Sequence, residues 1–192
     1  MRSNSPMSVE HQRAVPVPLP SDCGIARAYE SVNLADAYSI ELPACTSTSP
    51  ELLARFIFSH QASWIRGLLK VRDALVAGVG LKTAKHLASL GDPNKVGIFK
   101  VYSTNETEIV LGEDDKHLDF RVSVLCSGDA RQESKRHLVL STVVHCHNRL
   151  GRLYIFLIAP FHRLVVQSSL RSAARIGWPR APDAKADPPS GW

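Results

Sequence analysis

His145 and His147 form the pair of side chains in this sequence with the widest chemical range. They lie two apart in a β-branched run, so on a strand both would point to the same face. Two imidazoles could ligate zinc or another transition metal if a third ligand, His117 or Asp119, joined them from a nearby strand. The other interpretation is two polar residues that are hydrogen-bonded or solvated at the end of a strand. The sequence favours this second interpretation, so we expect no metal and no cofactor.

Cys146 lies between these histidines and is a candidate nucleophile. Adjacent residues on a strand point to opposite faces, so His145 and His147 are poorly placed to activate the Cys146 thiol, and we reject this dyad. The cysteines are widely spaced and contain no CxxC pair, which predicts a reducing, cytoplasmic location without disulfides. These cysteines are Cys23, Cys45, Cys126 and Cys146.

Three further side chains could act on a bound carbonyl compound. His162 could be a general acid or base because imidazole titrates near neutral pH. Tyr154 could donate a hydrogen bond to a ligand carbonyl, and Asp119 could act together with Arg121 two residues along a predicted strand. Each also has a structural interpretation, as a packed or hydrogen-bonded core residue or as an ion pair on the outer face. We therefore hold His162, Tyr154 and Asp119 as catalytic candidates without predicting that the protein is an enzyme.

A second group of residues is placed to contact a ligand if the fold encloses a cavity. Arg121 and His145 would orient its polar groups, and bulky side chains would line its walls. Trp64 belongs to an apolar helical stretch that predicts core or cavity wall. The predicted ligand-binding residues are Arg121, Tyr154, His145, Phe161 and Trp64.

The elements that must position these residues are mainly strands in the middle of the chain. Residues 117–125 alternate cleanly, which places Leu118, Phe120, Val122 and Val124 on one face and predicts that this face is core. Polar turns separate the runs, as expected for an antiparallel sheet. The predicted strands are residues 37–42, 96–102, 108–111, 117–125 and 138–147.

Helices are expected on both sides of this β region. Ser49-Pro50 predicts a helix start, since serine caps free N–H groups and proline suits the first helical position. A second helical stretch begins near Trp64 and ends near Gly78. After the strand at 138–147, we predict a turn at 148–151, an apolar strand at 152–159, and a final helix from Pro160 to Ile176.

The length of 192 residues predicts a single folded unit with loose ends. The proline- and serine-rich residues 1–33 are expected to form a flexible arm, mobile or draped on the surface. The folded domain is expected to span residues 34–177, and residues 178–192 to be a disordered tail. The N-terminal residues lack the apolar core of a secretory signal.

The formal charge of +5 is unevenly distributed, because residues 134–182 contain basic side chains and no Asp or Glu. Such a bias could attract an anionic ligand, nucleic acid or an acidic membrane surface. Without a nucleic-acid-binding motif, separate solvated faces are the favoured interpretation, and no specific nucleic acid partner is expected. The longest apolar run, residues 153–161, is too short to span a membrane, which takes roughly 20 residues. The basic residues are Lys135, Arg136, Arg149, Arg152, Arg163, Arg171, Arg175 and Arg180.

Three segments resemble a bacterial family of unknown function in the SRPBCC superfamily, which includes START-like and polyketide-cyclase-like domains. They are HLDFRVSV at 117–124, STVVHCHNRLGRLY at 141–154 and PFHRLVV at 160–166, and the resemblance covers roughly residues 34–177. It implies a helix-grip α+β fold: a curved antiparallel sheet, two short helices after the first strand, and a long C-terminal helix over an apolar cavity. Some relatives carry a short-chain-dehydrogenase-like domain, but this chain has no GxGxxG turn, so no nucleotide chemistry is carried over.

Three functions follow as hypotheses. The leading one is binding of a small, largely apolar ligand between the sheet and the C-terminal helix. The second is an enzyme of polyketide cyclase or dehydratase character, using His162, Tyr154, Asp119 or Arg121 on a carbonyl compound. The third is an interaction module with a filled core and no ligand. The sequence makes no prediction of oligomeric state.

Overall fold

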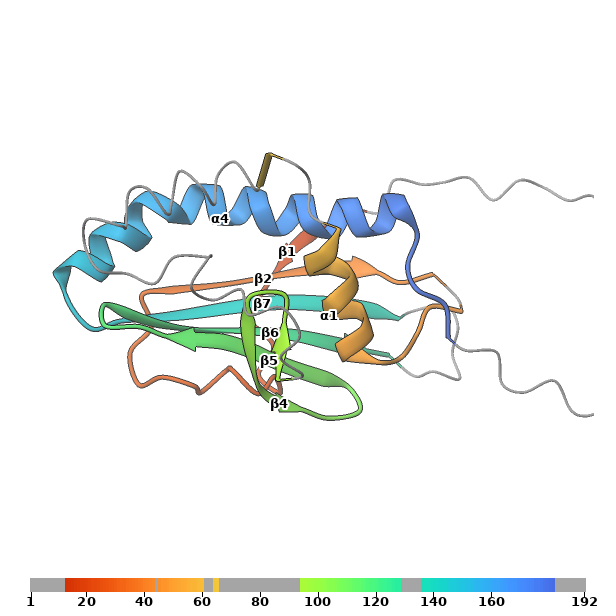
Figure 1. Ribbon diagram of the computed structural model, residues 1–192, viewed down its shortest axis with the longest axis horizontal. Helices are drawn as coiled ribbons and strands as arrows, with labels where there is room; N and C mark the ends of the chain where they lie inside the picture. Colours follow the sequence, from red (N-terminus) through yellow and green to blue (C-terminus); the bar gives the residue numbers. More distant parts are fainter. Residues whose placement is uncertain (1–12, 44, 61–63, 66–93, 129–135, 182–192) are drawn as a thin grey trace, which may run out of the picture.

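The computed structural model describes residues 13–43, 45–60, 64–65, 94–128 and 136–181. These residues form an open, fully antiparallel sheet of seven strands in the order β1-β2-β7-β6-β5-β4-β3. The strands are β1 (Val15–Val17), β2 (Leu34–Glu41), β3 (Lys95–Val96), β4 (Phe99–Thr104), β5 (Glu108–Asp114), β6 (Leu118–Ser127) and β7 (His137–Cys146). Two helices, α1 (Pro50–Ser59) and α4 (Arg149–Ile176), cover the same face of the sheet (Figure 1).

The α+β class, the antiparallel sheet and the long C-terminal helix are confirmed. The centre of the sheet is the pairing of β6 with β7, in continuous register from Leu118↔Cys146 to Ser127↔His137. As predicted from the alternation, Val122 and Val124 point to the helix-covered face and belong to the main core. The predicted strand at 96–102 is instead two strands, β3 and β4, separated at Gly97, which has a positive φ of 62°.

The start of α1 is the one that the sequence predicts. The Ser49 side chain accepts a hydrogen bond from the Leu52 N–H at 3.3 Å and so caps the helix. Leu53, Ala54 and Ile57 lie on its inner side and are fully buried in the main core. The second predicted helix lies mostly outside the described residues. Of its residues, the structure describes only Trp64 and Ile65, and both are helical.

The prediction of a turn at 148–151 followed by a strand at 152–159 is wrong. Asn148 caps a single helix of 28 residues, accepting a hydrogen bond from the Gly151 N–H at 3.0 Å. The apolar residues that resemble a buried strand fall at helical spacing: Ile155 faces the sheet, whereas Leu153, Phe156 and Leu157 are exposed. The helix continues through Pro160, which lies inside it and does not mark its start.

Residues 13–33 of the N-terminal segment contact the sheet. β1 pairs with β2 as an edge strand of the sheet, and the residues around Cys23 and Ile25 then pack on its outer face, where Ile25 is 1% exposed. Cys23 and Ile25 form a second apolar cluster with Val110, Val139 and Val143 of the sheet. Burial of these apolar side chains holds the segment in place. Residues 1–12 lie outside the described part of the chain.

Residues 178–181 contact the folded core. The Trp178 side chain is buried in the main core, against Phe56 of α1. Two backbone hydrogen bonds then tie this segment to residues 45–47: Ser47 N–H to Pro179 O at 2.8 Å and Ala181 N–H to Cys45 O at 3.0 Å. Residues 182–192 are not described.

The close contact at the first turn of α4 gives a test of the helix start. A Cβ atom at Gly151 would lie 2.2 Å from the His117 carbonyl oxygen, so the backbone of the turn would have to shift. We expect Gly151→Ala to lower the free energy of unfolding by about 1–3 kcal/mol, measured by urea denaturation. Arg152→Ala, at an exposed position one residue later, is the control and should change it by less than about 0.5 kcal/mol. Equal effects of the two substitutions would contradict this packing.

Candidate functional site

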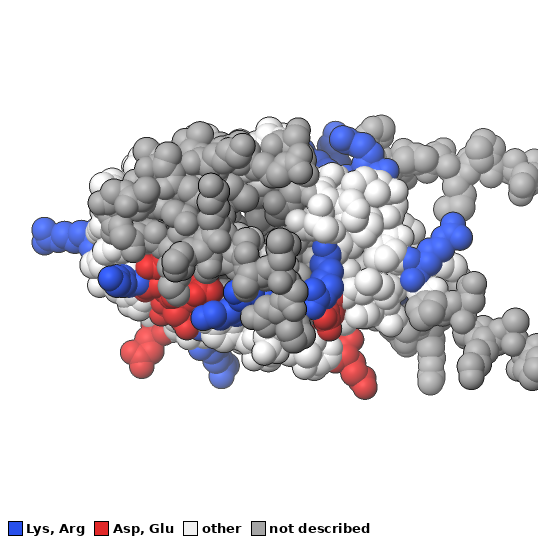
Figure 2. All heavy atoms as spheres, viewed as in Figure 1, with Lys and Arg blue, Asp and Glu red and all other residues white. Residues whose placement is uncertain are grey.

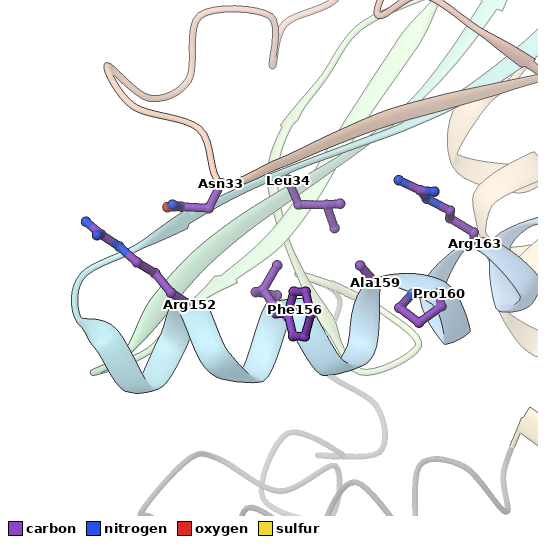
Figure 3. A pocket seen from close by; sticks show the side chains of 8 residues that line it. Asn33, Leu34, Arg152, Phe156, Ala159, Pro160 and Arg163 are labelled. Carbon is purple, nitrogen blue, oxygen red and sulfur yellow. The ribbon is translucent and has the colours of Figure 1, made fainter.

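A groove of about 440 Å³ runs between α4 and the start of β2. Its apolar walls are Leu34 from β2 and Ile155, Phe156, Ala159 and Pro160 from the helix. The helix-side residues recur at spacings of three and four, so they project along one side of α4. Arg152 and Arg163 lie at opposite ends of the groove, and Asn33 closes it on the strand side (Figure 3).

The strand side of this groove is fixed by hydrogen bonds to β7. The Asn33 N–H donates to Val144 O at 2.8 Å, and the Asn33 side chain accepts from the Cys146 N–H at 2.7 Å. Leu34, Ile155, Val144 and Cys146 pack together in a small apolar cluster at this end of the sheet. The groove therefore has one rigid strand wall and one helical wall.

Asp36 of β2 and His162 of α4 form a polar pair beneath the helix, next to the groove residue Leu34. His162 Nε2 is 3.3 Å from Asp36 Oδ1, and the two side chains are 22% and 11% exposed. Asp36 pairs in register with Thr142 of β7, whose side chain is also buried on the helix-covered face. Of the predicted catalytic candidates, His162 contacts Asp36 beneath α4; it does not line the groove, although Pro160 and Arg163 of the same helix turn do.

Asp119 and Arg121 lie on the opposite, outer face of the sheet. The Arg121 guanidinium lies 3.6 Å from the centre of the Tyr102 ring and donates to Asp114 Oδ1 at 2.7 Å. Tyr102 donates to the other carboxylate oxygen of Asp114 at 2.8 Å. Arg121 is thus held by an aromatic ring and a carboxylate far from the groove, in the structural role that the sequence left open.

Burial and hydrogen bonding in this outer cluster shift the pKa values of its members. Burial of the phenol raises the pKa of Tyr29 to about 12, although the nearby Arg121 opposes the shift. Burial and the hydrogen bond to Asp114 also raise the pKa of Tyr102. For Asp114, burial alone would raise the pKa, but hydrogen bonds from Arg121 and Tyr102 outweigh it and lower the pKa.

The two histidines at the end of β7 do lie together, as their spacing predicts. Their ring centres are 5.1 Å apart, and His147 Nε2 is 3.0 Å from Asp119 Oδ1. His145 Nδ1, however, lies 2.8 Å from Ser31 O, and its ring stacks on Tyr29. Within the described residues, no group of three or more His, Cys, Asp or Glu side chains is arranged to hold a metal ion.

The remaining predicted residues are separated from the groove or lie at its edge. Tyr154 belongs to α4 and not to a strand, and it packs beside the cluster around Ile155. Phe161 and Trp64 are exposed. Burial raises the pKa of Cys146, so this thiol has the environment of a packing residue and not of an activated nucleophile.

The sequence does not predict the groove, because half of its lining residues belong to the segment 152–159 that was predicted as a strand. Asp36 had a detectable signal. It alternates with Tyr38 and Ile40, which are core residues, so the same alternation places a carboxylate on the core face. A charged side chain on an apolar face requires a partner, and that requirement points to a site.

The basic side chains of residues 134–182 have different structural roles. Arg136 is buried and donates to Thr46 O and Ser47 O, whereas Arg152 and Arg163 line the groove. On the face in Figure 2, the visible Lys and Arg side chains stand apart, and acidic side chains lie among several of them. By length and composition α4 could also cross a membrane, and only 17% of its most apolar window is buried, but a single such helix is weak evidence of a span.

Comparison with known proteins places this architecture in a family. The model described as "Protein of unknown function (DUF2867)" matches residues 28–169, which include the groove and the polar pair beneath α4. The chain belongs to this family. No curated protein and no solved structure matched the chain. The DUF2867 match covers β2 through most of α4, so every residue of the groove lies within it.

The outer cluster predicts how stability depends on alkaline pH. Tyr29 has a raised pKa of about 12 in the folded chain and would titrate near 10 when unfolded. Its contribution to stability is therefore complete below pH 10 and is lost as the pH rises toward 12. We expect phenolate absorbance at 295 nm to show a step near pH 12 that Tyr29→Phe removes and that urea-unfolded protein lacks. Persistence of the step in Tyr29→Phe would refute this assignment.

Proposed function

We propose that this DUF2867 chain binds a small, largely apolar molecule in the groove between α4 and β2. The observation that carries the proposal is the groove itself, an apolar trough of about 440 Å³ beside the helix. This volume lies within the range of roughly 300–1,000 Å³ that is typical of small-molecule sites. Apolar burial would supply most of the binding free energy, at about 25 cal/mol per Å² of surface removed from water.

The two arginines suggest an anionic group on the ligand. Arg152 and Arg163 stand at opposite ends of an otherwise apolar trough (Figure 3). A guanidinium can donate two parallel hydrogen bonds to a carboxylate, which would fix the orientation of an apolar acid in the groove. An apolar carboxylate is therefore the ligand class that the lining favours.

We further infer that the chain is a bacterial, cytoplasmic member of the SRPBCC helix-grip superfamily. The support is a long C-terminal helix packed along an antiparallel sheet, together with the segments at 117–124, 141–154 and 160–166 that resemble that superfamily. The ligand site proposed here lies where a helix-grip cavity is expected, between the sheet and the C-terminal helix.

Binding is favoured over a cyclase-like reaction by the positions of the candidate residues. Asp119 and Arg121 lie on the outer face of the sheet, and Tyr154 packs into an apolar cluster. His162 is left as the one titratable candidate beside the groove. It is paired with Asp36, and this pairing supports a role in fixing a ligand group.

Filling the groove tests the proposal. We expect Ala159→Phe to weaken binding of the fluorescent probe 1-anilinonaphthalene-8-sulfonate at least tenfold, because the new ring would occupy the trough that the probe needs. Arg171→Phe is the matched control, since it adds the same ring to an exposed position of α4 outside the groove. Circular dichroism would establish that both variants fold.

Native mass spectrometry of protein purified from its host would then identify a molecule that co-purifies with the chain. A co-purifying apolar acid would support the proposal. Equal probe binding by the wild type, Ala159→Phe and Arg171→Phe would overturn it. So would a wild-type protein that carries no co-purifying molecule and binds no probe, which is the result expected of a ligand-free interaction module.

A further inference from the structure

We infer that Asp36, Thr142 and His162 form a polar anchor that receives a hydroxyl group of the bound molecule. This inference rests on the proposed function, since the anchor would be the inner end of the same site. It extends that function by naming a second ligand group and the three side chains that recognise it.

The anchor is assembled from three elements on the helix-covered face of the sheet. Asp36 of β2 and Thr142 of β7 are directly paired across neighbouring strands, so their Cβ atoms are neighbours. His162 reaches down from α4, and its Nε2 lies 3.3 Å from Asp36 Oδ1. The three side chains therefore meet between the helix and the sheet.

Two oxygen atoms of the anchor have no hydrogen-bond partner among the residues that the structure describes. These are Asp36 Oδ2 and Thr142 Oγ1; both are buried, and Thr142 is only 3% exposed. Buried polar atoms are nearly always hydrogen-bonded, because an unpaired one costs about 1–3 kcal/mol. Two such atoms on directly paired residues indicate a place for a polar group that binds to both.

The chemistry of these two atoms selects the group. An ionised Asp36 can only accept a hydrogen bond, whereas the Thr142 hydroxyl can donate one. A hydroxyl on the ligand satisfies both, because the same oxygen donates to Asp36 and accepts from Thr142. A carboxylate would be repelled by Asp36, and an ether would lack the proton that Asp36 requires.

The anchor lies next to the groove but does not line it, so a ligand would have to extend from the groove beneath α4 to reach it. Asp36 is two residues from Leu34 on the same face of β2, and His162 lies between Pro160 and Arg163 on α4. It separates the apolar cluster around Ile155 from the main core around Val166. A molecule with an apolar body for the groove and one hydroxyl for the anchor matches this arrangement.

The test compares two probes that differ in one proton donor, 1-naphthol and 1-methoxynaphthalene, by isothermal titration calorimetry. We expect the wild-type chain to bind 1-naphthol at least tenfold more tightly. Thr142→Val keeps the shape but removes the hydroxyl, so it should abolish this preference while leaving 1-methoxynaphthalene binding within about twofold. Thr142→Ser should restore the preference.

Ser169→Ala is the matched control. Ser169 of α4 also has a buried hydroxyl with no partner in the described part of the chain, but its neighbour Leu170 lies in the main core, further along the helix than the groove residues. The preference should survive this change.

Each contrary outcome has a distinct meaning. If the wild type binds both probes equally, or if Thr142→Val keeps the preference, water occupies the anchor and the inference is wrong, although the proposed function stands. If the wild type binds neither probe nor 1-anilinonaphthalene-8-sulfonate, the proposed function fails as well. Should Thr142→Val not fold, the wild-type comparison alone still decides whether the hydroxyl is recognised.

Discussion

The packing of one side of α4 along β2 and β7 is the constraint on which the rest of the structure depends. The helix is 28 residues long, and its inward positions Ile155, Val166, Leu170 and Ala173 are buried at intervals along that length. Because these residues lie on one stripe, the opposite stripe must face away from the sheet, whatever its composition. The exposed phenylalanines and leucines of α4 and the groove at its edge both follow from this single helix orientation.

The same packing makes the helix–sheet interface uneven. Two apolar clusters, one around Ile155 and one around Val166, are separated by the polar pair of Asp36 and His162. A fully apolar layer at this position would pack the helix on the sheet without burying polar groups, and even a buried ion pair can often be replaced by packed apolar residues with a neutral or stabilising effect. The pair therefore adds little to stability that apolar residues could not supply, and its position beside the groove fits recognition better than support.

Features that depend on residues close in the sequence could be predicted, and features that depend on distant residues could not. The strand at 117–125 and the start of α1 depend on local alternation and on one capping serine, and both were predicted correctly. The segment 152–159 was not, because a continuous apolar run suits a buried strand and a helix equally until its neighbours are known. The groove could not be predicted either, because its helical wall exists only when Ile155, Ala159 and Arg163 share one side of a helix.

The candidate residues show the same limit at the level of chemistry. The sequence placed His145 and His147 on one face, and the structure agrees, but it could not show that Ser31 and Tyr29 from the N-terminal segment contact His145. Arg121 was likewise a reasonable ligand-binding candidate until Tyr102 and Asp114 enclosed its guanidinium. A polar side chain becomes available for function only when its own protein leaves it unsatisfied. By that criterion Asp36 and Thr142, which the sequence passed over, are candidates beside His162, because each keeps a buried oxygen without a partner among the described residues.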